Sequence, residues 1–253
     1  DSYSVELSDM VAEQRRTGLT VAPEAASPRL RAVINKFIPD EDLLDMSGEA
    51  FKKGWKHVKL YFMLGLPTER DEYIEAIADL VHRTMDNGRQ FTKFPKVNLG
   101  VSTFVPKPFT PFQWAAQIDI DENRRRQDVL DRHLGRNRDI KYGRHDPEET
   151  FLEGLVSRTD RRAADLLEAA FRKGARFDAW REHLDFELWL AAIEETGFDV
   201  ADALRERALD ERLPWDHLDI HIPKQWFAED WERAKQLQWA EDDDRKQQSA
   251  PLP

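Results

Sequence analysis

The sequence contains no cysteine in its 253 residues. Without a thiol, these residues can form no disulfide, no thiolate zinc site, no cysteine nucleophile and no cysteine-ligated iron–sulfur cluster. The sequence also lacks an apolar run near the ~18–20 residues that cross a bilayer, and no signal-peptide pattern opens it. We therefore expect a cytoplasmic protein that does not enter a membrane.

Basic residues are fewer than acidic ones. The chain has 38 Lys and Arg against 49 Asp and Glu, a net charge of −11. Nucleic acid held by bulk electrostatics needs a basic surface, so the charge does not indicate such a partner. Most of the excess acid lies beyond residue 120, and six of the eight tryptophans lie beyond residue 179. Two regions of different composition are therefore expected.

The first region alternates helical and extended patterns. Apolar spacing predicts helices that begin near residues 4, 27, 39, 68 and 121, and strands at 19–22, 58–66 and 97–105. Strands separated by helices of this length pair in parallel through right-handed crossovers. The run at 58–66 is nearly all apolar, which is typical of a strand covered on both faces.

The second region is mainly helical. Its apolar spacing predicts helices at 147–156, 160–173, 186–196, 200–208 and 225–239, with a short alternating strand at 218–222. The last residues are acidic and polar, which is typical of a disordered tail. We thus divide the chain into an α/β part (1–137), a mainly α part (138–237) and a tail (238–253).

Polar and turn-forming residues follow each predicted strand of the first region. In parallel α/β folds, ligands bind at the carboxyl ends of the strands. Those ends are Pro23-Glu24-Ala25, Gly65-Leu66-Pro67-Thr68-Glu69 and Phe104-Val105-Pro106-Lys107-Pro108. The sequence therefore predicts a ligand site along this edge.

The same three segments resemble radical SAM enzymes. PEAASPRLR at 23–31 with INK at 34–36 resembles their fourth strand, KLYFMLGLPTE at 59–69 their fifth, and STFVPKPFTPF at 102–112 their sixth. The chain is most similar to an uncharacterised subfamily that carries a cobalamin-binding-type domain ahead of the barrel. The later region of that subfamily is matched by His145–Glu148, Gly174–Trp180 and Leu213–Asp219.

The resemblance implies the later half of a partial (β/α)6, TIM-like barrel followed by a mainly helical region. It implies S-adenosylmethionine as cofactor and a [4Fe–4S] cluster on a Cys-x3-Cys-x2-Cys loop, which would lie upstream of Asp1, with cobalamin in a further upstream domain. We therefore expect the C-terminal portion of a radical SAM enzyme, inactive alone, whose partner is the missing N-terminal half of the barrel. Its substrate is unknown. The alternative is a non-catalytic binding or scaffold module derived from that fold.

The resemblance makes three residues near the first strand end candidate contacts for the cofactor. The Glu24 carboxylate could accept hydrogen bonds from the ribose hydroxyls or balance the positive charge of the sulfonium. It could instead be a negative charge that stabilises the N-terminus of the next helix. Ser27 is more simply that helix's N-cap. Lys36 could pair with the methionine carboxylate, although a Lys also favours a helix C-terminus.

Three further candidates follow the next two strands. Gly65 lacks a Cβ and would let adenine approach the strand closely. Met63 shares a strand face with Tyr61, a face expected to point into the barrel, although such residues are more often core. Val105 precedes a proline that forces an extended exit, which would present its backbone groups to adenine. Glu69 is expected to be only a first-turn helix charge.

No metal site is assigned. His217, Asp219 and His221 would share one face of the predicted strand at 218–222, a spacing that could ligate a metal but is equally natural on a solvated edge strand. The run Arg124–Arg126 is interleaved with acidic residues, which favours a solvated helix face with ion pairs.

Overall fold

The computed structural model describes residues 18–237 in two compact units. The first unit holds residues 18–102, 125–144 and 234–237, and the second holds 103–124 and 145–233. The predicted helix at 4–16 and the predicted tail at 238–253 lie outside the described residues. Within residues 18–237, no helix is long and apolar enough to cross a membrane.

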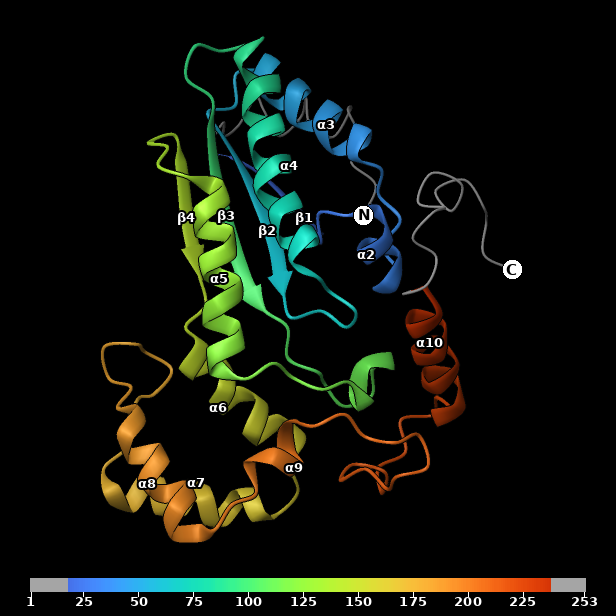
Figure 1. Ribbon diagram of the computed structural model, residues 1–253, viewed down its shortest axis with the longest axis vertical. Helices are drawn as coiled ribbons and strands as arrows, with labels where there is room; N and C mark the ends of the chain where they lie inside the picture. The colour runs from blue at the N-terminus through green and yellow to red at the C-terminus, as the bar shows by residue number, and fades with distance from the viewer. Residues whose placement is uncertain (1–17, 238–253) are drawn as a thin grey trace. The chain divides into compact units, whose positions relative to one another are not determined.

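The first unit is built on a four-stranded sheet. Its strands are β1 (Leu19–Glu24), β2 (His57–Leu64), β3 (Lys96–Thr103) and β4 (Ile140–Arg144), in the spatial order β1-β2-β3-β4. β1 pairs in parallel with β2, and β3 pairs in parallel with β4. Helices separate successive strands, and the arrows in Figure 1 run in a common direction. The predicted α/β class and the parallel strand pairing are therefore confirmed.

Helices cover one face of this sheet. They are α3 (Asp40–Lys52), α4 (Asp71–Arg89) and α5 (Ile120–Leu134), whose first turn belongs to the second unit, and the short helix α2 (Pro28–Val33) follows β1. Figure 1 shows α3, α4 and α5 on the same side of the strands. α4 places Ile74, Ile77 and Val81 at helical spacing against the sheet, and all three are buried in the core.

Burial along β2 alternates. Val58, Leu60, Phe62 and Leu64 are buried under the helices, whereas Tyr61 between them is 44% exposed. The prediction that this strand is covered on both faces is therefore wrong for the described residues. The sequence misled because Tyr61 and Met63 are apolar on a face that these residues leave open.

The second unit is mainly helical. It contains the short 3₁₀ helix η1 (Pro111–Trp114), α6 (Pro147–Arg158), α7 (Arg162–Lys173), α8 (Phe186–Thr196), α9 (Val200–Leu204) and most of α10 (Lys224–Gln236). Apolar residues of α6 to α9 form its core, among them Leu155, Leu166 and Ala192. α7 ends at Gly174, whose φ of +113° is the left-handed cap that glycine adopts without strain.

Two elements differ from the sequence prediction. Residues 218–222 form an irregular, bent segment, and Leu218 and Ile222 are exposed, so the predicted strand is wrong. An alternating sequence forms a β-strand only when another strand pairs with it, and no strand of the described chain pairs with this segment. Conversely β4, with the mixed sequence IKYGR, was missed because its alternation is weak and its pairing with β3 decides its conformation.

Candidate functional site

The end of β1 presents an ion pair. Glu24 has a φ of +67°, a left-handed conformation that costs a residue with a Cβ on the order of 1 kcal/mol. The strand register shifts between Val21 and Glu24. The Glu24 carboxylate lies 3.7 Å from Lys36 Nζ, both side chains are partly exposed, and Nζ also donates to the carbonyl of Ala22. The two predicted contacts are thus brought together as one accessible pair of opposite charges.

Ser27 has a structural task in the same loop. Its Oγ accepts a hydrogen bond of 3.0 Å from the backbone N–H of Leu30, and Pro28 occupies the first turn of α2. The N-cap interpretation is therefore confirmed.

Gly65 begins the turn that follows β2. Its φ is +84°, and its N–H donates to Glu69 Oε2 over 2.7 Å. Arg126 Nη1 from α5 lies 2.5 Å from the same oxygen, and the Glu69 side chain is only 1% exposed. Burial raises the pKa of Glu69 to about 7, against the opposing charge of Arg126. The buried Glu69 carboxylate therefore links the turn after β2 to α5. The prediction that Glu69 is a charge in the first turn of a helix is wrong, since α4 begins at Asp71.

Arg29 of α2 holds the far side of the same turn. The side chain is buried, and it donates to the Thr68 carbonyl over 2.9 Å and to Thr68 Oγ1 over 3.0 Å. Its Nε donates to the Tyr73 hydroxyl over 2.8 Å. Thr68 itself has a φ of +66°. One buried guanidinium thus fixes a turn that otherwise carries an unfavourable backbone conformation.

Arg31, two residues later, holds the loop after β1 in the same way, through hydrogen bonds to its backbone. It is buried and donates to the carbonyls of Ala25 and Ala26 over 3.1 and 2.9 Å. It also pairs with Asp40 over 2.5 Å. Sequence reasoning gave neither Arg29 nor Arg31 a role. The available signal was their alternation with Leu30, Ala32 and Val33 in a helix that is otherwise apolar.

Met63 and Tyr61 lie on the open face of the sheet, as their shared strand face predicts. Met63 is partly exposed. Tyr61 lies across Gly100 of β3, where an added Cβ would come within 2.6 Å of its ring. A flat, partly apolar surface thus leads along β2 to Gly65.

Val105 and the other five candidates fall in different units. Val105 belongs to the second unit, whereas Glu24, Ser27, Lys36, Met63 and Gly65 belong to the first. Val105 is buried two residues beyond the end of β3. Lys107 in the same exit segment forms a surface ion pair with Glu153 over 2.5 Å.

The histidine cluster does not assemble a metal site. His221 Nδ1 lies 3.4 Å from Asp219 Oδ2, and both side chains are exposed on an irregular segment. Across residues 18–237, no group of three His, Cys, Asp or Glu side chains is arranged to hold a metal ion.

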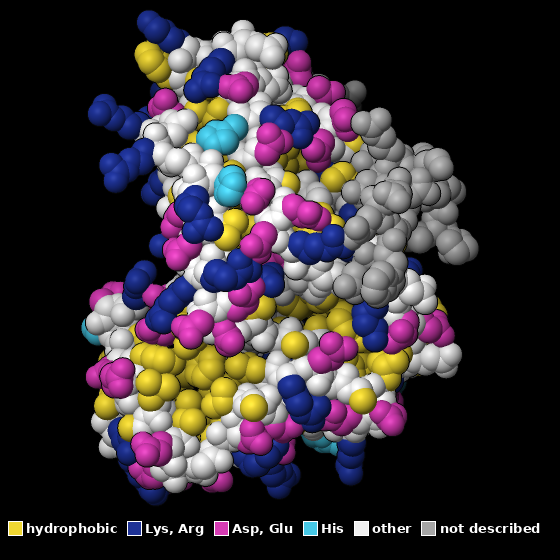
Figure 2. Space-filling model, viewed as in Figure 1, with side chains coloured by type: hydrophobic (Ala, Val, Ile, Leu, Met, Phe, Trp, Pro, Cys, Tyr) yellow, Lys and Arg dark blue, Asp and Glu magenta, His cyan; other side chains and the backbone are white. Residues whose placement is uncertain are grey.

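The arginine run on α5 divides into two environments. Arg124 pairs with Glu148 over 2.6 Å, and Arg125 makes two bonds of 2.7 and 2.8 Å to Asp71, all at the surface. Figure 2 shows basic and acidic side chains interspersed on this face of the molecule. The solvated-face prediction is confirmed for these two residues, whereas Arg126 is largely buried against Glu69.

Comparison with known proteins gives a partial match. An uncharacterised protein of Methanocaldococcus jannaschii is 39% identical over 107 residues, which is 42% of this chain and 22% of that protein. The chain thus matches about a fifth of that relative's length, and the relative's description names no activity. No protein-family model and no solved structure matches the chain.

Proposed function

We propose that this chain forms the part of a radical SAM enzyme that grips the organic portion of S-adenosylmethionine. The observation that carries the proposal is the carboxyl edge of β1 and β2. There Glu24 and Gly65 both take left-handed backbone conformations directly at the strand ends, and buried arginines fix both following loops. Ligands of parallel α/β folds bind at this edge.

A partial barrel is the finer fold that we propose. Strand order follows chain order, and the covering helices lie on one face, as a segment of a (β/α) barrel requires. The open face with Tyr61 and Met63 would then line the barrel interior.

The residues at this edge fit the organic part of the cofactor. The Glu24 carboxylate can accept hydrogen bonds from the ribose hydroxyls or balance the positive charge of the sulfonium. The Lys36 ammonium can form an ion pair with the methionine carboxylate. Gly65 offers a backbone without a Cβ to the flat adenine, and Met63 offers an apolar contact. When cleaved reductively, S-adenosylmethionine supplies a 5′-deoxyadenosyl radical; the chain's own residues would bind and orient it.

The residues do not fit an iron–sulfur cluster. The 253 residues contain no cysteine, and no metal-binding group is present among residues 18–237. A cluster would need ligands from another polypeptide segment, so no catalytic step is assigned to this chain.

Isothermal titration of the 253-residue chain with S-adenosylmethionine tests the proposal. We expect binding that Glu24→Gln weakens about tenfold, because one charge-assisted contact is lost. Glu41→Gln, which removes the same charge from an exposed position of α3, should leave the affinity unchanged. Absence of binding, or equal effects of the two variants, would refute the grip and favour the non-catalytic scaffold alternative.

A further inference from the structure

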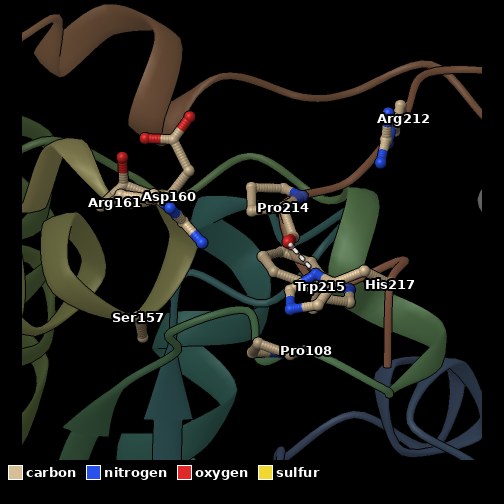
Figure 3. Close-up of a pocket in the computed structure, with 9 residues that line it drawn as sticks. Pro108, Ser157, Asp160, Arg161, Arg212, Pro214, Trp215 and His217 are labelled. Atoms are coloured by element: carbon tan, nitrogen blue, oxygen red, sulfur yellow. Dashed lines mark hydrogen bonds between the residues drawn. The ribbon is translucent and has the colours of Figure 1, made fainter. Parts of the chain in front are cut away.

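A pocket of about 550 Å³ lies within the second unit (Figure 3). It is formed by the segment that joins α6 to α7, by the loop that follows α9, and by Pro108. Its volume falls in the range of ~300–1,000 Å³ that is usual for small-molecule sites. Pro108 comes from the segment that follows β3, and none of the six candidate cofactor contacts, Glu24, Ser27, Lys36, Met63, Gly65 and Val105, lines the pocket.

The pocket lining carries cations without carboxylate partners. Arg161 and Arg212 are both exposed, and neither forms an ion pair with another residue of the described chain. Figure 3 shows them on opposite sides of Pro214 and Trp215. His217 also lines the pocket, and because its Nδ1 donates to the Pro214 carbonyl over 3.0 Å, its Nε2 is the ring nitrogen left free.

The one carboxylate of the lining is already engaged. Asp160 Oδ1 accepts from the backbone N–H and from Nε of Arg162, both over 2.9 Å. These bonds hold the pKa of Asp160 below its usual value. The lining therefore holds two guanidinium charges against one carboxylate, and its net charge is positive.

Two buried arginines lie beside the pocket. Arg158 lies in the sequence between the lining residues Ser157 and Thr159, and it donates hydrogen bonds to the carbonyls of Ala203 and Arg205. The guanidinium carbon of Arg207 lies 5.7 Å from the centre of the Trp215 ring. Neither has a carboxylate within salt-bridge distance among the described residues, and Arg158 Nη1 and Arg207 Nε lack hydrogen-bond partners. Burial, followed by the nearby charges of Arg207 and Arg205, lowers the pKa of Arg158 to about 10.

Uncompensated buried charge is costly, and an anion nearby offsets that cost. Guanidinium groups form paired hydrogen bonds with phosphate oxygens. A phosphate monoester carries close to two negative charges, which matches two free guanidinium groups better than the single charge of a carboxylate. Trp215 and the neighbouring prolines add apolar surface on which a flat group can pack.

We propose that this pocket binds a phosphate monoester carried on a flat, apolar group. The proposal does not depend on the function proposed for the strand ends, since the two sites share no residue.

Calorimetric titration of the 253-residue chain with phenyl phosphate tests this site. We expect binding that is at least tenfold tighter than that of benzoate, which keeps the ring but carries one charge. We expect Arg161→Gln and Arg212→Gln each to weaken phenyl phosphate binding about tenfold. Asp160→Asn, which removes the negative charge of the lining, should instead strengthen it about threefold.

Two variants serve as controls. Arg172→Gln removes the same charge from an exposed position of α7 that pairs with Glu168, and should not change the affinity. Glu24→Gln, in the first unit, should not change it either. The proposal is overturned by absence of binding up to about 10 mM, by benzoate binding as tightly as phenyl phosphate, or by Arg172→Gln matching Arg212→Gln.

Discussion

At the scale of single residues, Glu69 joins two parts of the first unit through one oxygen atom. That oxygen accepts from the Gly65 N–H in the turn after β2 and from Arg126 on α5. Its burial disfavours the charged form, so the folded protein binds a proton at Glu69 more tightly than the unfolded chain does.

The pH dependence of stability follows from this difference. Because the folded pKa of about 7 lies above the ordinary value of 4.5, Glu69 contributes most below pH 4.5, and its contribution is lost as the pH rises through 7. Its part of the unfolding free energy should fall by at most about 1.4 kcal/mol per pH unit in that window. Urea unfolding of the wild type and of Glu69→Gln at pH 5, 6 and 7 measures it.

The glutamine variant should lose this pH-dependent part of the stability, since it cannot titrate but can still accept the Gly65 N–H. Glu72→Gln, an exposed change at the start of α4, should keep the wild-type slope. Parallel pH profiles for wild type and Glu69→Gln would contradict the assignment.

At the scale of elements, α3 packs against α4 at Gly88, a position of α4 without a side chain. A Cβ at Gly88 would come within 2.8 Å of the buried Phe51 ring and of Pro95. Gly88→Ala should therefore cost about 1–3 kcal/mol by overpacking, although alanine favours helix by up to about 1 kcal/mol.

Thermal and urea unfolding of Gly88→Ala measure that cost. Gly143→Ala in β4 is the matched control, because a Cβ there meets nothing within 4 Å, and its stability should change by less than about 0.5 kcal/mol. A Gly88→Ala protein as stable as the wild type would mean that Phe51 moves aside freely.

The elements also show what a single sequence can predict. Long, strongly periodic segments such as α4 and α8 follow from apolar spacing alone, and α8 occupies its predicted residues 186–196. β4 and the irregular segment at 218–222 could not be predicted, because the presence or absence of a neighbouring strand decides both. At the candidate site, the sequence indicates the edge and the Ser27 cap, but it does not indicate that Glu69 is buried against Arg126 or that Arg29 is buried against Thr68.

At the scale of the whole molecule, the two units are interleaved along the chain. Residues 103–124 leave the first unit to join the second, and 125–144 return to the first. This segment of residues 103–124, here called the excursion, supplies buried contacts of the second unit. Trp114 is fully buried, its carbonyl accepts from the Arg207 N–H over 2.8 Å, and Gln113 accepts from Trp215 Nε1 over 2.6 Å.

Residues 145–233 should therefore not fold stably alone. We expect that segment to show low helicity and no cooperative thermal transition by circular dichroism, because it would expose the surface that Trp114 covers. Residues 103–233, which restore the excursion, should regain cooperativity. A cooperative transition for 145–233 alone would show that the excursion is dispensable.

Four buried arginines, Arg29, Arg31, Arg158 and Arg207, share one habit: each donates to main-chain carbonyls of a segment outside its own helix or turn. Every amino acid carries the same carbonyl, so recognition of this kind is indifferent to which residue supplies it. The segments that these arginines hold are therefore free to change in sequence while keeping their path. The paths of the loop after β1 and of the turn after β2 therefore depend on Arg31 and Arg29, which lie outside those segments, and lysine, which lacks the planar fork, cannot make the same paired hydrogen bonds.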